Sequence, residues 1–194
     1  MFETPTKINI VGIGGSLRED SCCYLALDHV IGLVTQMGCR ARVLDLRRMP
    51  LPFCNGDHCQ QGDAYPAVAE LHKAVREAQA IVLATPEYHG GVSGVLKNAV
   101  DLLGFEHLEG KVVGIIGVLG GAANLDATNE LARIMRHCRA WVIPQQIAIG
   151  RAQNIFAGKR ISDADVLKRF QQFAHSLVWS TARLCISMNQ QISA

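Results

Sequence analysis

The sequence predicts an α/β protein in which a parallel sheet is covered by helices on both faces. Apolar runs of strand length alternate along the chain with longer amphipathic segments of helical period. The expected strands are almost wholly apolar, which is typical of a sheet buried on both faces. The chain has 194 residues, of which 49% are apolar, and this is enough for one sizeable core and short for two. We therefore expect one domain over residues 1–194.

The first part of the chain is expected to form two strands, one helix and a long loop. Residues 7–13 are an apolar run typical of a buried strand, and residues 21–37 follow as a helix with apolar side chains near helical spacing. Gly38 is expected to end that helix. Residues 42–46 are the second strand. Residues 47–64 are rich in Pro, Gly, Asn and Asp, and they predict an irregular loop of a length that is often functional.

The rest of the chain repeats the alternation of strand and helix. The expected strands are residues 80–85, 111–119 and 146–149, with Pro144 breaking the last strand at its start. The expected helices are residues 65–78, 94–103, 125–140 and 163–186. Loops are expected from Pro86 and at Gly120-Gly121, directly after the third and fourth strands. This alternation indicates right-handed crossovers between parallel strands.

The winding of the sheet decides where a ligand would bind. In the flavodoxin-like order 2-1-3-4-5, the winding reverses between strands one and three and opens a crevice above their carboxyl ends. This order brings residues 14–21 and 86–91 together although they lie far apart in the sequence, and Gly120-Gly121 would close the third side. We therefore predict a three-layer α/β sandwich with a five-stranded parallel sheet of this order, in which three loops surround one ligand.

The dinucleotide-binding Rossmann winding is the alternative, because Gly12-Ile13-Gly14-Gly15-Ser16-Leu17 partly matches G-x-G-x-x-G. Leu17 stands where the third glycine permits close packing of helix on strand. Asp45 lies well beyond the spacing of about 20 residues that is usual for the ribose-binding acid. A Walker loop does not fit either, because the segment contains no G-K-[ST].

The first loop carries groups that suit a phosphate monoester. Gly15-Ser16-Leu17-Arg18-Glu19-Asp20-Ser21 places the hydroxyls of Ser16 and Ser21, the guanidinium of Arg18 and the first backbone amides of a helix around one turn. Taken alone, the same residues could be an ordinary helix cap beside a solvated arginine. The second loop, with a stiff proline, a tyrosine and several glycines, favours a bound mononucleotide over that alternative.

Both loops resemble motifs of the NADPH-dependent FMN reductase family, which are flavodoxin-like flavoenzymes that include quinone, chromate and azo-dye reductases. The family's G-S-x-R-x-x-S corresponds to Ser16, Arg18 and Ser21, and its P-E-Y-N-x-x-x-x-G-x-L-K-N-A-[IV]-D corresponds to residues 86–101. Cys23 stands where relatives often have Asn, and His89 replaces the commoner Asn of the second motif. The likeness runs from the first strand through at least residue 150.

The resemblance implies a cofactor site for FMN. Its phosphate would lie on Ser16, Arg18 and Ser21 beside Cys22 and Cys23, with residues 86–90 wrapping the isoalloxazine and Gly120 and Gly121 near the pyrimidine side. The cofactor-binding residues implied are Ser16, Arg18, Ser21, Cys22, Cys23, Pro86, Glu87, Tyr88, His89, Gly90, Gly120 and Gly121. We expect the Glu87 carboxylate to make a loop or subunit contact, since it would oppose the charge of a reduced flavin.

The activity implied is that of an FMN-dependent NAD(P)H oxidoreductase. Hydride would pass from NADPH or NADH to bound FMN and on to a quinone, azo dye, free flavin or chromate-like metal ion by a ping-pong mechanism. This chemistry requires no acid–base side chain, so no catalytic residue is predicted. The alternatives are a non-enzymatic electron carrier or a flavin-binding redox sensor, although the chain shows no acidic face of the kind that docks redox partners, or a nucleotide-dependent dehydrogenase without flavin. The resemblance also implies a homodimer or homotetramer.

Composition argues against several partners. The formal charge is +2 and the basic residues form no run, so nucleic acid is not an expected partner. No apolar stretch approaches the roughly 20 residues that cross a bilayer, and the N-terminus does not resemble a signal peptide, so we expect a cytoplasmic protein. Seven cysteines without a C-x-x-C pair indicate reduced thiols. The segment Cys54-Asn55-Gly56-Asp57-His58-Cys59 lacks a second ligand pair for zinc, so we expect a polar turn and no metal.

Overall fold

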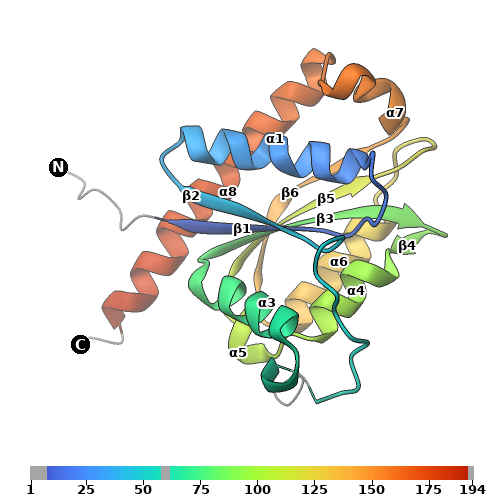
Figure 1. Ribbon diagram of the computed structural model, residues 1–194. Coiled ribbons are helices and arrows are strands. Elements are labelled where there is room, and N and C mark those ends of the chain that lie inside the picture. The colour runs from blue at the N-terminus through green and yellow to red at the C-terminus, as the bar shows by residue number, and fades with distance from the viewer. Residues whose placement is uncertain (1–7, 58–61, 192–194) are drawn as a thin grey trace.

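The computed structural model describes residues 8–57 and 62–191, with side chains as far as residue 184. Its central feature is a sheet of parallel strands in the order β2-β1-β3-β5-β6 (Figure 1). The strands are β1 (Asn9–Gly14), β2 (Arg40–Asp45), β3 (Ala80–Tyr88), β5 (Val112–Val118) and β6 (Trp141–Ile149). Counted along the chain without the short β4, this is the predicted order 2-1-3-4-5, and the prediction of a flavodoxin-like α/β sandwich is confirmed.

Helices cover both faces of the sheet (Figure 1). The helices α1 (Cys22–Gln36) and α8 (Ala164–Gln191) pack on one face, and α3 (Pro66–Glu77), α4 (Gly94–Asp101), α5 (Phe105–Leu108) and α6 (Asp126–His137) pack on the other. Neighbouring residues of β1 show how the strand serves both faces. Ile10 belongs to the hydrophobic core under α1 and α8, whereas Val11 belongs to the core under α3, α4, α5 and α6. Because successive side chains of a strand point to opposite faces, an apolar strand such as β1 supplies both cores at once.

The helix boundaries follow capping chemistry. Ser21 caps α1 by accepting a hydrogen bond from the Cys23 amide, and Ser93 caps α4 by accepting one from the Leu96 amide. Pro66 opens α3 at a position where a missing amide hydrogen costs nothing. Among the described residues, no helix is both long and apolar enough to cross a membrane.

The prediction of a loop from Pro86 was wrong in part. Strand β3 continues through Tyr88 and pairs antiparallel with β4 (Gly91–Val92), so that Glu87 faces Val92 and Tyr88 faces Gly91. The two residues between them, His89 and Gly90, have φ of 52° and 76°. Positive φ at both central residues is the geometry of a type I′ hairpin turn, which matches the twist of the flanking strands. The segment is therefore a hairpin that projects from the end of the sheet (Figure 1).

The last strand is longer than the sequence predicts. Strand β6 begins at Trp141 and runs past Pro144, while its pairing with β5 shifts from Val113↔Val142 to Ile115↔Gln146. Pro144 lies within that irregularity on an edge strand, where the lack of an amide hydrogen does not break the ladder. The short elements α5 and α7 (Ala152–Ile155), and the 3₁₀ turn Ala157–Lys159, were not predicted either. In the loop predicted over residues 47–64, residues 47–57 contain neither helix nor strand, and residues 58–61 lie outside the described part of the chain. Residues 62–64 are helical, so the prediction of a loop was wrong there.

Candidate functional site

The segment between β1 and α1 is held against the neighbouring strand and helix by its first residue. The Gly15 amide donates to the Ala84 carbonyl at 2.7 Å, and the Ser93 hydroxyl donates to the Gly15 carbonyl at 2.6 Å. A Cβ on Gly15 would come within 2.7 Å of both Leu96 and Ser93. The glycine is therefore required by close packing, and the following residues emerge at the carboxyl end of the sheet.

Those following residues form a cluster of hydrogen-bond donors. Ser16 and Ser21 are buried, and within the described residues each hydroxyl accepts a backbone bond, from the Arg18 and Cys23 amides respectively, and donates none. The exposed Arg18 guanidinium forms no ion pair in the same part of the chain. Two hydroxyl donors, a guanidinium and the N-terminus of α1 are the groups that bind an anion, and above all a phosphate.

The β3–β4 hairpin stands on the second side of this cluster and is fastened to α6. The Glu87 carboxylate accepts hydrogen bonds from the Asn124 side-chain amide at 2.8 Å and from the Ala127 backbone amide at 3.3 Å. In return, the Glu130 carboxylate of α6 accepts a bond from the Val92 amide of β4 at 2.8 Å. These contacts fix the hairpin relative to the segment that follows β5.

That segment forms the third side and rests on the end of β6. The Arg151 amide donates to the Gly121 carbonyl at 2.6 Å, and the Ala152 amide donates to the Leu119 carbonyl at 3.0 Å. A Cβ on Gly150 would collide with the backbone of Ala122 and Ala123, so the close approach requires glycine there. Through this contact the start of α7 also reaches the cluster.

These segments enclose one crevice at the point where the winding of the sheet reverses. It has a volume of about 120 Å³ and adjoins a second hollow of about 590 Å³, with which it shares Arg18, Asp20, Ser21, Cys22 and Gln153. The crevice is lined by Ser16, Arg18, Asp20, Ser21, Cys22, Cys23, Pro86, Glu87, Tyr88, Val118, Leu119, Gly120, Ala152 and Gln153. The first space alone is below the range of about 300–1,000 Å³ typical of ligand pockets, but the two together fall within it.

Most of the candidate residues from the sequence meet at this crevice. His89, Gly90 and Gly121 do not line it, because the first two form the turn of the hairpin and the third faces Arg151. Asp20, Val118, Leu119, Ala152 and Gln153 line it without having been predicted. Val118 and Leu119 end a predicted strand beside Gly120 and could have been inferred from that position. Ala152 and Gln153 belong to a short helix that no sequence pattern indicated.

The two neighbouring cysteine thiols of the site have pKa values above that of a free thiol. Burial raises the pKa of the Cys23 thiol to about 12. Burial also raises the pKa of Cys22, although the Arg18 charge opposes that rise. Since the thiolate is the reactive form, both groups act at neutral pH as weak hydrogen-bonding side chains.

No cluster of side chains suited to a metal ion occurs in residues 8–57 and 62–191. Cys54 is tied to α4, since its thiol donates to the Asp101 carbonyl at 3.2 Å and its amide donates to the Asn98 side chain at 2.9 Å. The polar turn expected over residues 54–59 falls partly on His58 and Cys59, which lie outside the described residues.

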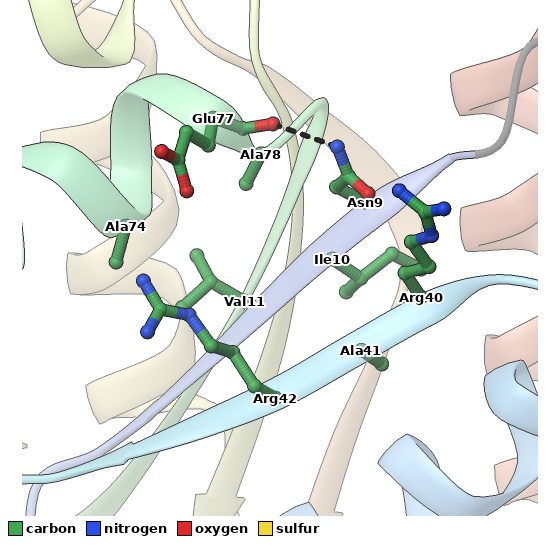
Figure 2. A pocket seen from close by; sticks show the side chains of 9 residues that line it. All are labelled: Asn9, Ile10, Val11, Arg40, Ala41, Arg42, Ala74, Glu77 and Ala78. Atoms are coloured by element: carbon green, nitrogen blue, oxygen red, sulfur yellow. Dashed lines mark hydrogen bonds between the residues drawn. The ribbon is translucent and has the colours of Figure 1, made fainter.

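Another cavity lies at the opposite end of the sheet and is lined by different residues (Figure 2). It measures about 530 Å³ and opens between β1, β2 and the end of α3. Arg40, Arg42 and Glu77 line it over an apolar floor, and the Asn9 side chain donates to the Glu77 carbonyl at 3.2 Å. Ligands of open α/β sheets bind beyond the carboxyl ends of the strands, whereas this cavity lies at the amino ends. The crevice at the switch point is therefore the candidate site.

Comparison with known proteins agrees with this geometry. The family model for NADPH-dependent FMN reductase matches residues 8–154, which contain both sequence motifs and all the residues that line the crevice. The chain belongs to the NADPH-dependent FMN reductase family. As a family member it is an oxidoreductase that depends on FMN and a reduced nicotinamide nucleotide.

Individual relatives extend the likeness over most of the chain. It is 30% identical over 181 residues to the NADPH-dependent FMN reductase ArsH of Shigella flexneri, an alignment that covers 90% of this chain and 69% of that protein. It is 37% identical over 138 residues to an FMN-dependent NADPH-azoreductase of Staphylococcus haemolyticus, which covers 70% and 73%. The structure of the flavoenzyme FerB, an NAD(P)H:(acceptor) oxidoreductase from Paracoccus denitrificans, superposes with a TM-score of 0.75 at 23% identity and covers 91% and 98%. That superposition supports the fold.

The residues at the crevice fit FMN. A phosphate monoester would meet the hydroxyls of Ser16 and Ser21 and the guanidinium of Arg18. Within the described residues neither hydroxyl has an acceptor and the guanidinium has no ion pair. A flat ring would meet the rigid Pro86, the half-exposed Tyr88 and the backbone at Gly120. Cys23, with its buried thiol, would be a weak hydrogen-bonding group beside such a phosphate.

Proposed function

We propose that the crevice binds FMN, with the phosphate on Ser16, Arg18 and Ser21 and the ring beside Pro86, Tyr88 and Gly120. The observation that carries this proposal is the convergence of donors without acceptors and a rigid hairpin at the switch point of the sheet. The proposal treats residues 1–194 as a single FMN-binding domain, since the crevice draws on segments from β1 to α7.

When bound, FMN supplies a ring that takes hydride from NAD(P)H and gives it to an acceptor. The chain places and surrounds this ring. Gly120 lines the crevice, so backbone amides near it would lie beside the ring. Preorganised donors of this kind would stabilise the negative charge that develops on a reduced flavin. Val118 and Leu119 supply the apolar wall of that site. No side chain of the crevice is required to move a proton in this scheme.

The acceptor is proposed to be a small, electron-poor molecule such as a quinone, an azo dye, free flavin or a chromate-like metal ion. The names of the azoreductase relatives support this class, and so does Tyr88, whose half-exposed ring offers an aromatic surface for a planar acceptor. We propose that nicotinamide and acceptor use the same open ring face in turn, which makes the mechanism ping-pong. Membership of a reductase family argues against a non-enzymatic carrier or sensor.

We further propose that the enzyme works in the cytoplasm as a homodimer or homotetramer. Free thiols at Cys22, Cys23, Cys39, Cys54 and Cys138 suit a reducing compartment. The exposed ring of Tyr88 beside the crevice supports a neighbouring subunit as an additional wall. Light scattering at micromolar concentration tests the assembly, and a monomer alone would contradict it.

An absorption spectrum followed by rapid mixing tests the proposed function. The purified protein, supplied with FMN, should show the two visible bands of a bound oxidised flavin. Under anaerobic conditions NADPH should bleach these bands within the turnover time, and a quinone or azo dye should restore them. A protein that binds FMN but is not bleached by NADPH or NADH would be a carrier or sensor. A protein that binds no FMN would remove the assignment of the crevice.

A further inference from the structure

The side chain of Arg47 lies beside the segment that carries Ser16, Arg18 and Ser21, and it lines the hollow that adjoins the crevice. Arg47 comes directly after β2, and its guanidinium is bidentate to the Asp45 carboxylate, with Nε at 2.8 Å from Oδ1 and Nη2 at 2.7 Å from Oδ2. The Arg47 backbone amide also donates to Asp45, at 3.0 Å. Both side chains are mostly covered, with exposed fractions of 27% for Arg47 and 21% for Asp45. The pair is therefore a fixed platform at the end of β2.

The third guanidinium nitrogen of Arg47, Nη1, points at the backbone of residues 18 and 19. Nη1 donates to the Glu19 carbonyl at 3.0 Å and lies 3.4 Å from the Arg18 carbonyl. The guanidinium also stacks over the Tyr24 ring, 4.1 Å from its centre. Tyr24 is itself locked, because its hydroxyl donates to the Gly14 carbonyl at 2.8 Å and accepts from the Leu46 amide at 3.0 Å. Arg47 thus connects the ends of β1 and β2 to residues 18 and 19.

Few other contacts hold this part of the segment. Residues 17–20 are exposed, and within the described part of the chain their backbone is otherwise held by the bond from the Arg18 amide to Ser16, at 3.3 Å. The ion pair between Asp20 and Lys159 spans 3.7 Å, and both side chains are largely in water. Exposed pairs of this kind contribute little. The Arg47 contacts are therefore the best-ordered restraint on the backbone beside Arg18.

We propose that Arg47 is a positioning residue for the phosphate of FMN. It fixes the backbone at residues 18 and 19, so that Arg18 and the hydroxyls of Ser16 and Ser21 converge on the phosphate. The inference rests on the proposed FMN site. We assign Arg47 a positioning role and not that of a ligand, because its Nε and Nη2 are bonded to Asp45 and its Nη1 to the Glu19 carbonyl. The geometry needs arginine, since a planar fork can bind a carboxylate, stack on a ring and reach a carbonyl at once, whereas the single ammonium of lysine cannot.

The neighbouring Arg48 provides a matched control. Its side chain is 86% exposed, and its Nε lies 3.7 Å from the same Asp45 carboxylate. Arg48 therefore carries the same charge at the next position of the sequence, but within the described residues it forms no side-chain bond to residues 18 and 19. Removing either arginine changes the net charge of the protein by the same amount.

The test compares FMN with riboflavin, which has the same ring and ribityl chain but no phosphate. Dissociation constants for both are measured by flavin fluorescence with wild type, Arg47→Ala, Arg47→Gln, Arg47→Lys and Arg48→Ala. Arg47→Ala and Arg47→Gln should weaken FMN binding about tenfold, the effect of misplacing one charge-assisted bond, and leave riboflavin binding within about twofold. Arg47→Lys should recover only a small part of the loss, and Arg48→Ala should resemble wild type.

The outcomes separate the inference from the proposed function. A wild-type protein that binds riboflavin as tightly as FMN has no phosphate site here, and the proposed function fails with it. A wild type that prefers FMN, with variants at Arg47 that keep this preference or lose both ligands equally, overturns the role of Arg47 alone. Circular dichroism of the apoproteins checks folding, and Arg47→Gln keeps the test valid if Arg47→Ala does not fold.

Discussion

The Glu87 carboxylate accepts a hydrogen bond from the Asn124 side-chain amide, with 2.8 Å between oxygen and nitrogen. Its second oxygen accepts from the Ala127 amide in the first turn of α6, and Glu130 of α6 accepts from the Val92 amide of the hairpin. The hairpin thus provides the Glu87 carboxylate to a backbone amide of α6, and α6 provides the Glu130 carboxylate to a backbone amide of the hairpin. Glu87 is therefore engaged in joining two segments of the site, as expected for a carboxylate that would oppose charge on a reduced flavin.

Removal of this carboxylate should loosen the site. Glu87→Ala loses a cap at the N-terminus of α6, a change that costs about 0.5–2 kcal/mol of the free energy of unfolding. Urea unfolding of the apoprotein measures this, with Glu70→Ala, an exposed carboxylate on α3, as the control. Glu130→Ala should cost a similar amount. Because both bonds join the same two elements, the double variant should lose less than the sum of the two losses, whereas strict additivity would show that the bonds act independently.

Arg18→Ala should weaken FMN binding about 10- to 100-fold, since a charge-assisted hydrogen bond to phosphate contributes roughly 1.5–3 kcal/mol. Riboflavin binding should change little, and so should hydride transfer at saturating FMN. Arg40→Ala removes an exposed arginine at the far end of the sheet and serves as the control. An unchanged dissociation constant for FMN would remove Arg18 from the phosphate site.

His89 should be replaceable by residues that tolerate positive φ. Its φ is 52° at the first central position of the hairpin turn, and Asn, the commoner residue of the family motif, adopts this region readily. His89→Asn should therefore keep stability and FMN affinity. His89→Val should cost about 1–3 kcal/mol of unfolding free energy, because a β-branched residue is strained there. Equal stability of the two variants, measured by thermal unfolding, would show that the turn exerts no such constraint.

The Asp45–Arg47 pair should stabilise the fold over most of the pH range and fail only in acid. The hydrogen bonds from Arg47 lower the pKa of Asp45 to about 2. A carboxyl with a depressed pKa contributes its full stability above the unfolded value of about 3.9, and this contribution is lost as pH falls through the folded value. The difference in unfolding free energy between wild type and Asp45→Asn should be about 1 kcal/mol, level from pH 5 to 8, and should shrink from pH 5 towards pH 2.

The parts of the site that the sequence could predict are those built from neighbouring residues. Ser16, Arg18 and Ser21 lie within six residues at the junction of a strand and a helix, so their convergence follows from local geometry and the predicted winding. The hairpin was harder to predict from the sequence. His89 and Gly90 adopt positive φ, and residues of this kind occur in irregular loops as well as in two-residue turns.

The contacts that hold these parts in place could not be predicted from the sequence. Glu87 meets Asn124, which is 37 residues away, and Arg47 meets Glu19, which is 28 residues away. No sequence pattern around Glu87 or Arg47 indicates the partner of either side chain, because charged residues of the same kind occur throughout the chain. Such pairs become visible only when the strand ends are placed side by side.

The proposed mechanism makes a kinetic prediction that depends on how the ring would be enclosed. The segment 15–21, the hairpin and the backbone near Gly120 line one crevice, which would leave a single ring face open to solvent. If NADPH and the acceptor use that face in turn, they cannot be bound productively together. Initial rates at varied quinone and several fixed NADPH concentrations should then give parallel double-reciprocal lines, the sign of a ping-pong mechanism.

High quinone should also inhibit competitively against NADPH, because it would occupy the face that the nicotinamide needs. A Tyr88→Ala variant, which removes a half-exposed ring at the edge of that face, should alter the quinone KM and the quinone inhibition constant together, since one surface serves both events. Intersecting lines would instead require a ternary complex and a separate acceptor site. Residues 47–57, which are irregular and tied to α4 through Asn98, are the segment where we would then look for that site.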